Sequence, residues 1–397
     1  MTPPRTTLLR LREGHAKVGY AELFFDLVFV FAVTQLSHTL LEHLNPIGAL
    51  RTGLLFLGVW WMWIYTSWVT NWLDPEKVPV RLMIFALMLS GLLLSSSLPE
   101  AFGEHGLVFA AVFAATQVGR SAFMLWALRG GRSPGNFRNF IRITLWLSAS
   151  AVLWISGGLA DPDTRAWWWL GAVAIEYLGP FAYFRVPGLG RSSLSDWDVE
   201  GGHLSERCGL FVIIALGESI LITGATFAKL EWNPTTVAGF CVAFLGSVAM
   251  WWIYFDSGAA RGEHRITHGE DTASQARLAY TYLHLLIVGG IIVCAVADEL
   301  VLVHPDHAEA AGIAAIIGGP ALYLLGCGLF KWVTNTRRFP PVSHCGGLLM
   351  LAALAFAAGP MHLSPLLLGM LTTLVFVIVA GWETAAVRRA NSAPVGH

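Results

Sequence analysis

Long apolar segments are the feature that most limits what this chain of 397 residues can fold into. A membrane-spanning helix needs about 20 mostly apolar residues, and twelve such segments follow one another here. Lipid admits only helices and closed barrels, because all backbone polar groups must be paired. The sequence therefore predicts an all-α integral membrane protein with about twelve transmembrane helices. The predicted spans are residues 20–43, 47–72, 79–98, 105–128, 138–159, 166–185, 204–227, 233–256, 276–299, 309–331, 343–360 and 363–386.

Composition agrees with this class. Hydrophobic residues make up 55% of the chain and charged residues 13%, whereas a soluble domain carries about 25% charged residues. The net charge of -1 gives no basis for binding nucleic acid. The five cysteines are widely spaced, with no CxxC or His/Cys cluster. We therefore predict no disulfide framework, no metal site and no cofactor.

Lys and Arg are distributed unevenly between alternate loops. With the N-terminus inside, the outer segments hold only Arg51, Arg165 and Lys229 as basic residues. Acidic residues gather in these outer segments: Glu100, Glu104, Asp161, Asp163, Glu231, Asp298, Glu299, Asp306 and Glu309. Because short cytoplasmic loops carry the excess of Lys and Arg, both termini are predicted to be cytoplasmic. The predicted location is the bacterial inner membrane, with multiple passes.

The two halves of the chain share landmarks. Trp63-Ile64-Tyr65 recurs as Trp252-Ile253-Tyr254, each after an apolar helix, and Arg81 and Arg277 each open a later apolar run. Six spans per half give both repeats the same orientation, so we predict two parallel six-helix repeats. The predicted divisions are an N-terminal segment 1–19, a first repeat 20–187, a linker 188–203, a second repeat 204–386 and a tail 387–397.

Ionisable residues inside the predicted spans are the candidates for function, because a deep charge is costly and is by default a functional-site hypothesis. On the first helix Glu22, Asp26 and Ser37 fall on one stripe. On the seventh, Arg207 and Glu218 lie about 16 Å apart along the axis and cannot pair directly. The pathway or ion-site candidates are Asp26, Phe31, Gln35, His38, Ile214 and Glu218. The predicted supporting ion-pair network is Glu22, Arg81, Arg120, Glu176, His203, Glu206, Arg207, Asp256, Arg277 and His284.

Structural roles are the alternative for several of these residues. Arg81, Arg277 and Asp256 lie near helix ends, where charged side chains reach the interface. The tryptophans of the second helix are expected to face lipid or the interface; they are Trp60, Trp61, Trp63, Trp68 and Trp72. The pairs Gly289-Gly290 and Gly318-Gly319 are expected to permit close helix packing.

Two stretches resemble the signature segments of the bacterial low temperature requirement A (LtrA) family. The first runs from Glu22-Leu-Phe-Phe-Asp26 to Gln35-Leu-Ser-His38, and the second from His203-Leu-Ser-Glu206-Arg207 to Gly217-Glu218-Ser219. The resemblance extends over nearly the whole chain through the hydropathy pattern. It implies a multipass membrane protein, and the family's cold-growth name defines no chemistry.

Phe24-Phe25-Asp26 and the apolar run after it are also similar to the first helix of the lysosomal potassium channel family. That resemblance implies two six-helix repeats whose first and seventh helices line a pore. It places a constriction at Phe31 and Ile214, and Leu98-Pro99 fits the same pattern. Phe25 replaces a serine, and Gly209 stands where the second repeat would carry an aspartate, so the resemblance implies architecture rather than potassium selectivity.

The sequence favours a channel or transporter for a small ion or solute, with its pathway between the first and seventh helices and Glu218 as a cation or proton site. The alternative is an intramembrane enzyme or lipid-handling protein that uses His38, His203, Glu218 and His284 as acid–base groups. No catalytic nucleophile is predicted. A scaffold or sensor is disfavoured because the loops offer little surface. The expected partners are membrane lipid and the small ion or solute, and either one chain or a homodimer could close the pathway.

Overall fold

The structure, a computed structural model, describes residues 7–10, 18–129, 134–192, 200–256, 275–335 and 339–392. Apart from two isolated β-bridges, the regular elements in these ranges are helical. They are α1 (Tyr20–Glu42), α2 (Pro46–Trp72), α3 (Val78–Ser97), α4 (Gly106–Leu128), α5 (Pro134–Leu159), α6 (Pro162–Phe181), α7 (Gly201–Phe227), α8 (Pro234–Tyr254), the π-helix η3 (Arg277–Leu283), α11 (His284–Val303), α12 (Ala310–Val333), α13 (Val342–Ala358) and α14 (Pro365–Ser392). The predicted N-terminal segment, linker and tail lie partly outside the described residues.

Each predicted span overlaps one of these α-helices, which confirms the all-α membrane class. Among the residues that the structure describes, ten helical stretches are long and apolar enough to cross a membrane, with η3 and α11 counted as one. The other two are α6 and the shorter α13. Five helices start at a proline, namely α2, α5, α6, α8 and α14. Proline suits a first helical position because the amide hydrogen it lacks has no intrahelical partner there.

One helix end differs from the prediction in a way that matters for function. The ninth predicted span ends at 299, whereas α11 continues to Val303. His304 follows in a non-helical conformation and precedes Pro305, and a residue before proline is disfavoured in a helix. Asp298 and Glu299, the last acidic residues of the predicted span, therefore lie inside α11 rather than at its end.

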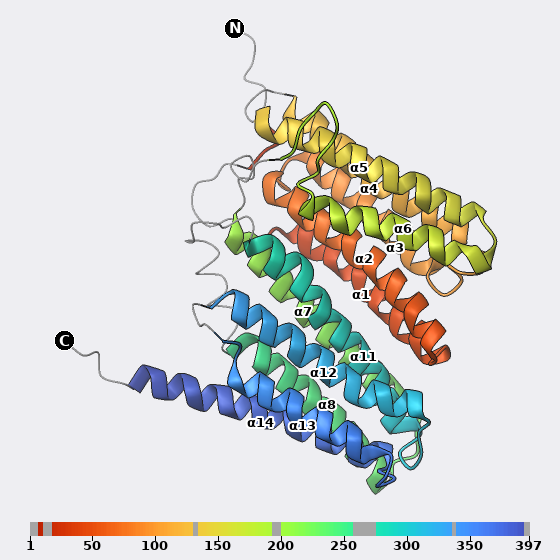
Figure 1. Ribbon diagram of the computed structural model, residues 1–397, viewed down its shortest axis with the longest axis vertical. Coiled ribbons are helices and arrows are strands. Elements are labelled where there is room, and N and C mark those ends of the chain that lie inside the picture. The colour runs from red at the N-terminus through yellow and green to blue at the C-terminus, as the bar shows by residue number, and fades with distance from the viewer. Residues whose placement is uncertain are drawn as a thin grey trace. The chain divides into compact units, whose positions relative to one another are not determined.

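The described chain divides into two compact units. Unit 1 comprises Met1–Thr39 and Ile47–Arg207, and unit 2 comprises Leu40–Pro46 and Cys208–His397. The division falls within α7, whose first residues up to Arg207 belong to unit 1. Within each unit the helices lie side by side along a common direction (Figure 1).

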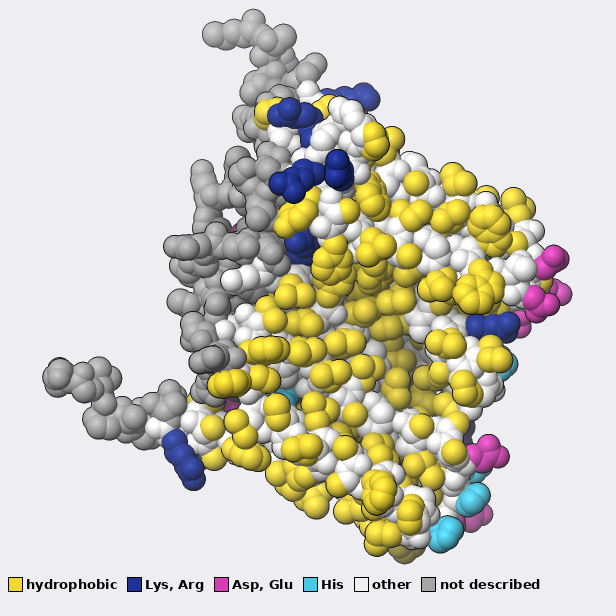
Figure 2. All heavy atoms as spheres, in the orientation of Figure 1, with side chains coloured by type: hydrophobic (Ala, Val, Ile, Leu, Met, Phe, Trp, Pro, Cys, Tyr) yellow, Lys and Arg dark blue, Asp and Glu magenta, His cyan; other side chains and the backbone are white. Residues whose placement is uncertain are grey.

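Exposed charges mark opposite ends of the helices in each unit. In Figure 2, hydrophobic side chains cover the sides of the helices, and charged ones gather at helix ends. We call the basic end of a unit the one with exposed Arg129 in unit 1 and Arg388 in unit 2. The acidic end is the one with exposed Glu104 in unit 1 and Glu309 in unit 2. This separation is the pattern that charge flanking of membrane helices produces.

Aromatic rings form much of the core of unit 1. Trp60, Trp61 and Trp63 on α2 are 1% exposed or less, and Trp154 of α5 and Trp169 of α6 are equally buried. Trp154 and Trp169 have ring centroids 5.4 Å apart. The expectation that the α2 tryptophans face lipid or the interface is wrong. Their large rings instead fill the space between helices, where they bury the most apolar area.

Glycines bring α11 and α12 of unit 2 together. A Cβ atom on Gly290 would lie 2.6 Å from the Tyr323 amide nitrogen, and one on Gly319 would lie 2.8 Å from that of Cys294. Gly326 meets Ile287 in the same way. The predicted close packing is therefore confirmed for Gly290 and Gly319, whereas Gly318 has open space around its Cβ position. This contact holds the helix that carries Asp298 against its neighbour.

Candidate functional site

A buried ion cluster lies at the basic end of unit 1. Arg207, in the first turns of α7, donates from Nη2 to Asp26 Oδ1 at 2.6 Å and from Nε to Asp26 Oδ2 at 3.2 Å. Its Nη1 donates to Glu22 Oε1 at 3.1 Å and to Thr70 Oγ1 at 3.1 Å. Trp63 completes the shell of Asp26 by donating from Nε1 at 2.7 Å. Asp26, Glu22 and Arg207 are 0% exposed, so this paired guanidinium keeps two carboxylates charged away from water.

Glu22 has a second set of partners. Arg10 donates from Nη2 to Glu22 Oε2 at 2.7 Å, and His203 Nε2 lies 3.0 Å from Oε1. Arg10 Nε also donates to the carbonyl oxygens of Thr70 and Leu73, each at 2.9 Å. These bonds tie the segment before α1 to the end of α2.

The protonation of His203 follows from its neighbour Asn71. The Asn71 amide is oriented by two backbone bonds to Glu200, with Nδ2 donating to the carbonyl oxygen and Oδ1 accepting from the amide nitrogen. Asn71 Nδ2 therefore faces His203 Nδ1 as a donor at 3.3 Å. Nδ1 therefore accepts, and Nε2 carries the proton that bonds Glu22. Arg10 Nη2, which lies 3.2 Å from Nε2, then faces a second donor and makes no hydrogen bond to it. With a neutral imidazole, the charges of two arginines and two carboxylates cancel.

A second buried pair of charges lies deeper in unit 1. Glu176 on α6 accepts hydrogen bonds from Ser150 Oγ at 2.6 Å, Gln117 Nε2 at 2.9 Å and Trp154 Nε1 at 3.1 Å. The other end of the Gln117 amide accepts from Arg120. Arg120 Nη1 also donates to the Met62 carbonyl oxygen and to Thr66 Oγ1, each at 3.0 Å. Gln117 thus bridges the two charges, and both stay inside the helical unit.

Unit 2 repeats part of this arrangement. Lys331 on α12 donates to the Ile253 carbonyl oxygen of α8 at 2.6 Å and pairs with Glu383 of α14 at 2.5 Å. His344 Nδ1 lies 3.5 Å from the other Glu383 oxygen. In both units, then, a base on the fourth helix binds a carbonyl of the second helix and is linked to an acid on the sixth.

His284 occupies a buried position at the end of η3. Its Nδ1 lies 2.8 Å from the Ala279 carbonyl oxygen, and Nε2 lies 2.7 Å from the Tyr254 hydroxyl. A carbonyl oxygen only accepts, so Nδ1 carries the proton and Nε2 accepts from Tyr254. The wider π-helical turn places the carbonyl five residues back within reach of this ring.

The remaining predicted residues are spread over the two units. Arg81 pairs with Glu76 at the surface at 3.0 Å, Asp256 accepts from Thr384 at 3.0 Å, and Glu206 accepts from the Val18 amide at 3.2 Å. Arg277 begins η3. Among the pathway candidates, Phe31 and His38 are exposed, Gln35 and Ile214 are partly exposed, and Glu218 is buried. Geometry therefore joins Asp26 to the network rather than to the other pathway candidates.

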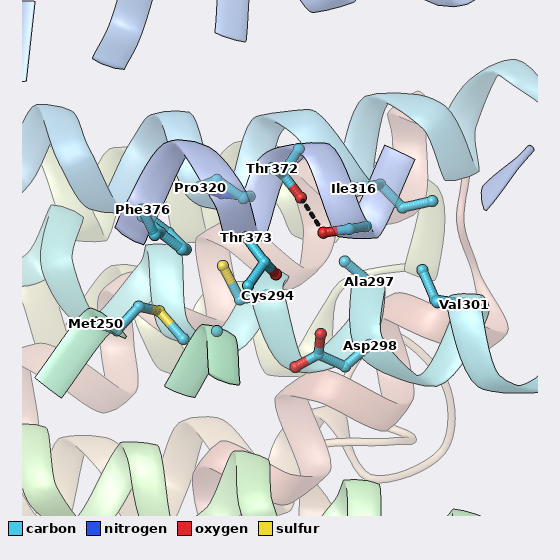
Figure 3. A pocket seen from close by; sticks show the side chains of 12 residues that line it. Met250, Cys294, Ala297, Asp298, Val301, Ile316, Pro320, Thr372, Thr373 and Phe376 are labelled. Atoms are coloured by element: carbon cyan, nitrogen blue, oxygen red, sulfur yellow. Dashed lines mark hydrogen bonds between the residues drawn. The ribbon is translucent and has the colours of Figure 1, made fainter. Parts of the chain in front are cut away.

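Asp298 differs from these acids. It is partly exposed and lines a small cavity of about 20 Å³ in unit 2, with walls from α8, α11, α12 and α14 (Figure 3). Glu22, Asp26 and Glu176 are each held by several donors, whereas Asp298 has no hydrogen bond or ion pair with any residue that the structure describes. A carboxylate in a membrane helix that faces a cavity with no protein partner has room for a ligand or a proton.

Sequence reasoning missed Asp298 because it counted this residue, in the last turn of the predicted span 276–299, among the outer acidic residues. The signal was present in Val303-His304-Pro305, where the proline marks the helix end several residues after Asp298. Three of the polar or helix-breaking positions around the cavity, Pro320, Thr372 and Thr373, come from the tenth and twelfth spans. Their proximity to Asp298 depends on helix packing, which has no local sequence signature.

The helices and their buried charges define a polytopic α-helical membrane protein. The family model of the bacterial low temperature requirement A protein (LtrA) matches residues 17–381, and the chain belongs to this family. An uncharacterized protein of Rhizobium meliloti (strain 1021) is 42% identical over 374 residues, which cover 94% of this chain and 90% of that protein. No solved structure matches the chain significantly.

Proposed function

We propose that the protein moves a small ion or solute across the membrane, as a channel or an ion-coupled transporter. The observation that supports this most directly is Asp298, a carboxylate inside a membrane helix that faces a cavity without a partner among the described residues. Ionisable groups inside membrane helices are energetically costly, and they are found mainly along ion and proton paths. The sequence-based assignment of Phe31 on α1 and Ile214 on α7 to the pathway is part of this proposal.

The buried ion clusters fit a supporting role in the same function. In the network of Glu22, Asp26 and Arg207, the carboxylates are already paired with the guanidinium and are not available to bind a passing ion. Removing one partner of such a network leaves an uncompensated buried charge. The network therefore serves to fix helices in place, while Asp298 remains open to a ligand.

The enzyme alternative finds less support in the geometry. His203 and Glu22 lie at hydrogen-bond distance, 3.0 Å, but both are 0% exposed and are occupied by the arginines around them. A general base must reach the proton that it abstracts from a substrate. His38 is exposed on α1, without an acid partner among the described residues.

The test is flux through purified protein in liposomes. A potassium gradient is imposed and proton movement is followed with a pH dye, with and without a protonophore. We expect flux in the wild-type protein and at least about a tenfold loss in Asp298→Asn, equivalent to about 1.4 kcal/mol. Asp306→Asn is the matched control, because Asp306 is exposed just beyond α11. Absence of any potassium or proton movement in wild-type protein, or equal flux in wild-type protein and Asp298→Asn, would count against the proposal.

A further inference from the structure

Two threonines line the cavity together with Asp298. Thr372 Oγ1 donates to the Gly369 carbonyl oxygen at 3.1 Å, and Thr373 Oγ1 donates to the Val242 carbonyl oxygen at 3.4 Å. Because each hydroxyl hydrogen is engaged, the hydroxyl lone pairs remain available to a ligand. Figure 3 shows both threonines of α14 at the cavity, with the Thr372 bond drawn and the Asp298 carboxyl group below them.

Pro320 frees a main-chain oxygen of α12 from helical hydrogen bonding. It lies inside α12 and lines the cavity together with Ile316, four residues earlier. Proline has no amide hydrogen, so the Ile316 carbonyl lacks its normal helical hydrogen bond. Carbonyls released from helical bonding are used to coordinate small cations at membrane depth.

Space and charge limit what such a site can hold. The cavity of about 20 Å³ has room for about one water-sized particle. Gly246 of α8 also lines the cavity, and a Cβ atom there would lie at contact distance, 3.4 Å, from Thr373 Oγ1. Asp298 supplies one negative charge, which balances a monovalent cation and would leave a divalent one with excess buried charge.

We propose that this cavity is a binding site for one alkali-metal cation, with the Asp298 carboxylate as the charged ligand and the Thr372, Thr373 and Ile316 oxygens as neutral ligands. The inference rests on the proposed transport function and names the ion that the same site would take. Oxygen donors are the ligands that hard cations prefer. A proton alone would need the carboxylate but not the two threonines that line the same cavity.

Binding is tested without transport, by thermal unfolding of the purified chain in detergent micelles. Sodium chloride or potassium chloride is titrated against choline chloride at constant ionic strength. We expect the unfolding temperature to rise saturably with one of the two cations, because a ligand that binds only the folded state stabilises it. Asp298→Asn should abolish the rise, Thr373→Val should weaken the apparent affinity at least about fivefold by removing one neutral oxygen, and Asp306→Asn should leave it unchanged.

The outcomes separate this proposal from the proposed function. No saturable rise with either cation in the wild-type protein would overturn the cation site, even if flux depends on Asp298, since a proton path would then suffice. Equal rises in wild-type protein and Asp298→Asn would also overturn it. A rise that depends on Asp298 would support the site even if liposomes show no flux. If Asp298→Asn fails to fold in choline chloride, Thr373→Val decides in the same way.

A soft-metal site is the rival that the same cavity could offer. Cys294 lies one turn before Asp298 on α11 and also lines the cavity. Micromolar zinc chloride is therefore added in a parallel titration with Cys294→Ala as the variant. Stabilisation by zinc that requires Cys294, together with none by sodium or potassium, would overturn the alkali-cation assignment. If Cys294→Ala folds and keeps its response to sodium or potassium, the result supports the alkali-cation assignment.

Discussion

Arg207 shows how one residue can organise the basic end of unit 1. Its guanidinium uses three nitrogens to reach Asp26, Glu22 and Thr70, and it lies 5.8 Å above the ring of Trp63. The planar fork of arginine permits this set of bonds, and a lysine ammonium could not reproduce it. The first residues of the two signature segments are far apart in the sequence, and the Arg207 side chain joins them.

Truncating Arg207 should be strongly destabilising. In Arg207→Ala the buried Asp26 carboxylate loses its only counter-charge at hydrogen-bond distance among the described residues, which costs about 3–5 kcal/mol. Arg81→Ala is the control, because its pair with Glu76 is exposed and such surface pairs contribute about 0–1 kcal/mol. Thermal unfolding in detergent compares the two. Similar shifts for both variants would mean that the buried cluster is not a structural lock.

Parts of this cluster could be predicted from sequence alone. The helical stripe of Glu22 and Asp26 follows from a spacing of four residues, and Arg207 was assigned to the same network. Arg10, Asn71 and Trp63 are not predicted, because their bonds join residues between 12 and 132 positions apart. Such contacts are fixed by helix packing. For the same reason, the sequence alone does not predict which residues line the Asp298 cavity.

At the level of elements, apolar periodicity and prolines located the helices, and packing decided which faces are buried. The α2 tryptophans are predicted to face lipid or the interface, but they are buried in the core of unit 1. Composition alone does not distinguish a lipid-facing ring from a core ring. The glycines of α11 and α12 were correctly assigned to packing. Only the geometry distinguishes the two positions of α12. A Cβ atom added at Gly319 would meet the neighbouring backbone, whereas one added at Gly318 would meet nothing within 4 Å.

This difference gives a matched pair of variants. Gly319→Ala places a Cβ atom 2.8 Å from the Cys294 amide nitrogen, so α11 and α12 must move apart. Overpacking of this kind costs about 1–3 kcal/mol. Gly318→Ala adds a methyl group in open space and should be neutral or slightly stabilising, by up to about 1 kcal/mol, from better helix propensity. Thermal unfolding of both proteins is the measurement. A larger loss in Gly318→Ala than in Gly319→Ala would contradict the observed α11–α12 contact.

At the level of the whole molecule, the two units resemble each other in their buried chemistry. Arg120 and Lys331 each bind a carbonyl of the second helix of their own unit, and Glu176 and Glu383 each close the arrangement from the sixth helix. In unit 1 the base is linked to the acid through Gln117, and in unit 2 the base and the acid form a direct ion pair. This correspondence supports the predicted internal repeat. The carbonyls that the two bases bind lie in or beside the shared Trp-Ile-Tyr landmarks, since Ile253 belongs to the second landmark and Met62 directly precedes the first.

Cysteine labelling in intact cells tests the predicted topology at both units. In a chain without its native cysteines, Glu104→Cys and Glu309→Cys lie at the acidic ends, and Arg129→Cys and Arg388→Cys at the basic ends. Because the excess of Lys and Arg stays in the cytoplasm, a membrane-impermeant maleimide should label only the first two. Permeabilised cells should show all four labelled, which controls for folding and access. Labelling of Arg129→Cys together with Glu309→Cys would mean that the units insert in opposite directions, and the parallel repeat would then be wrong.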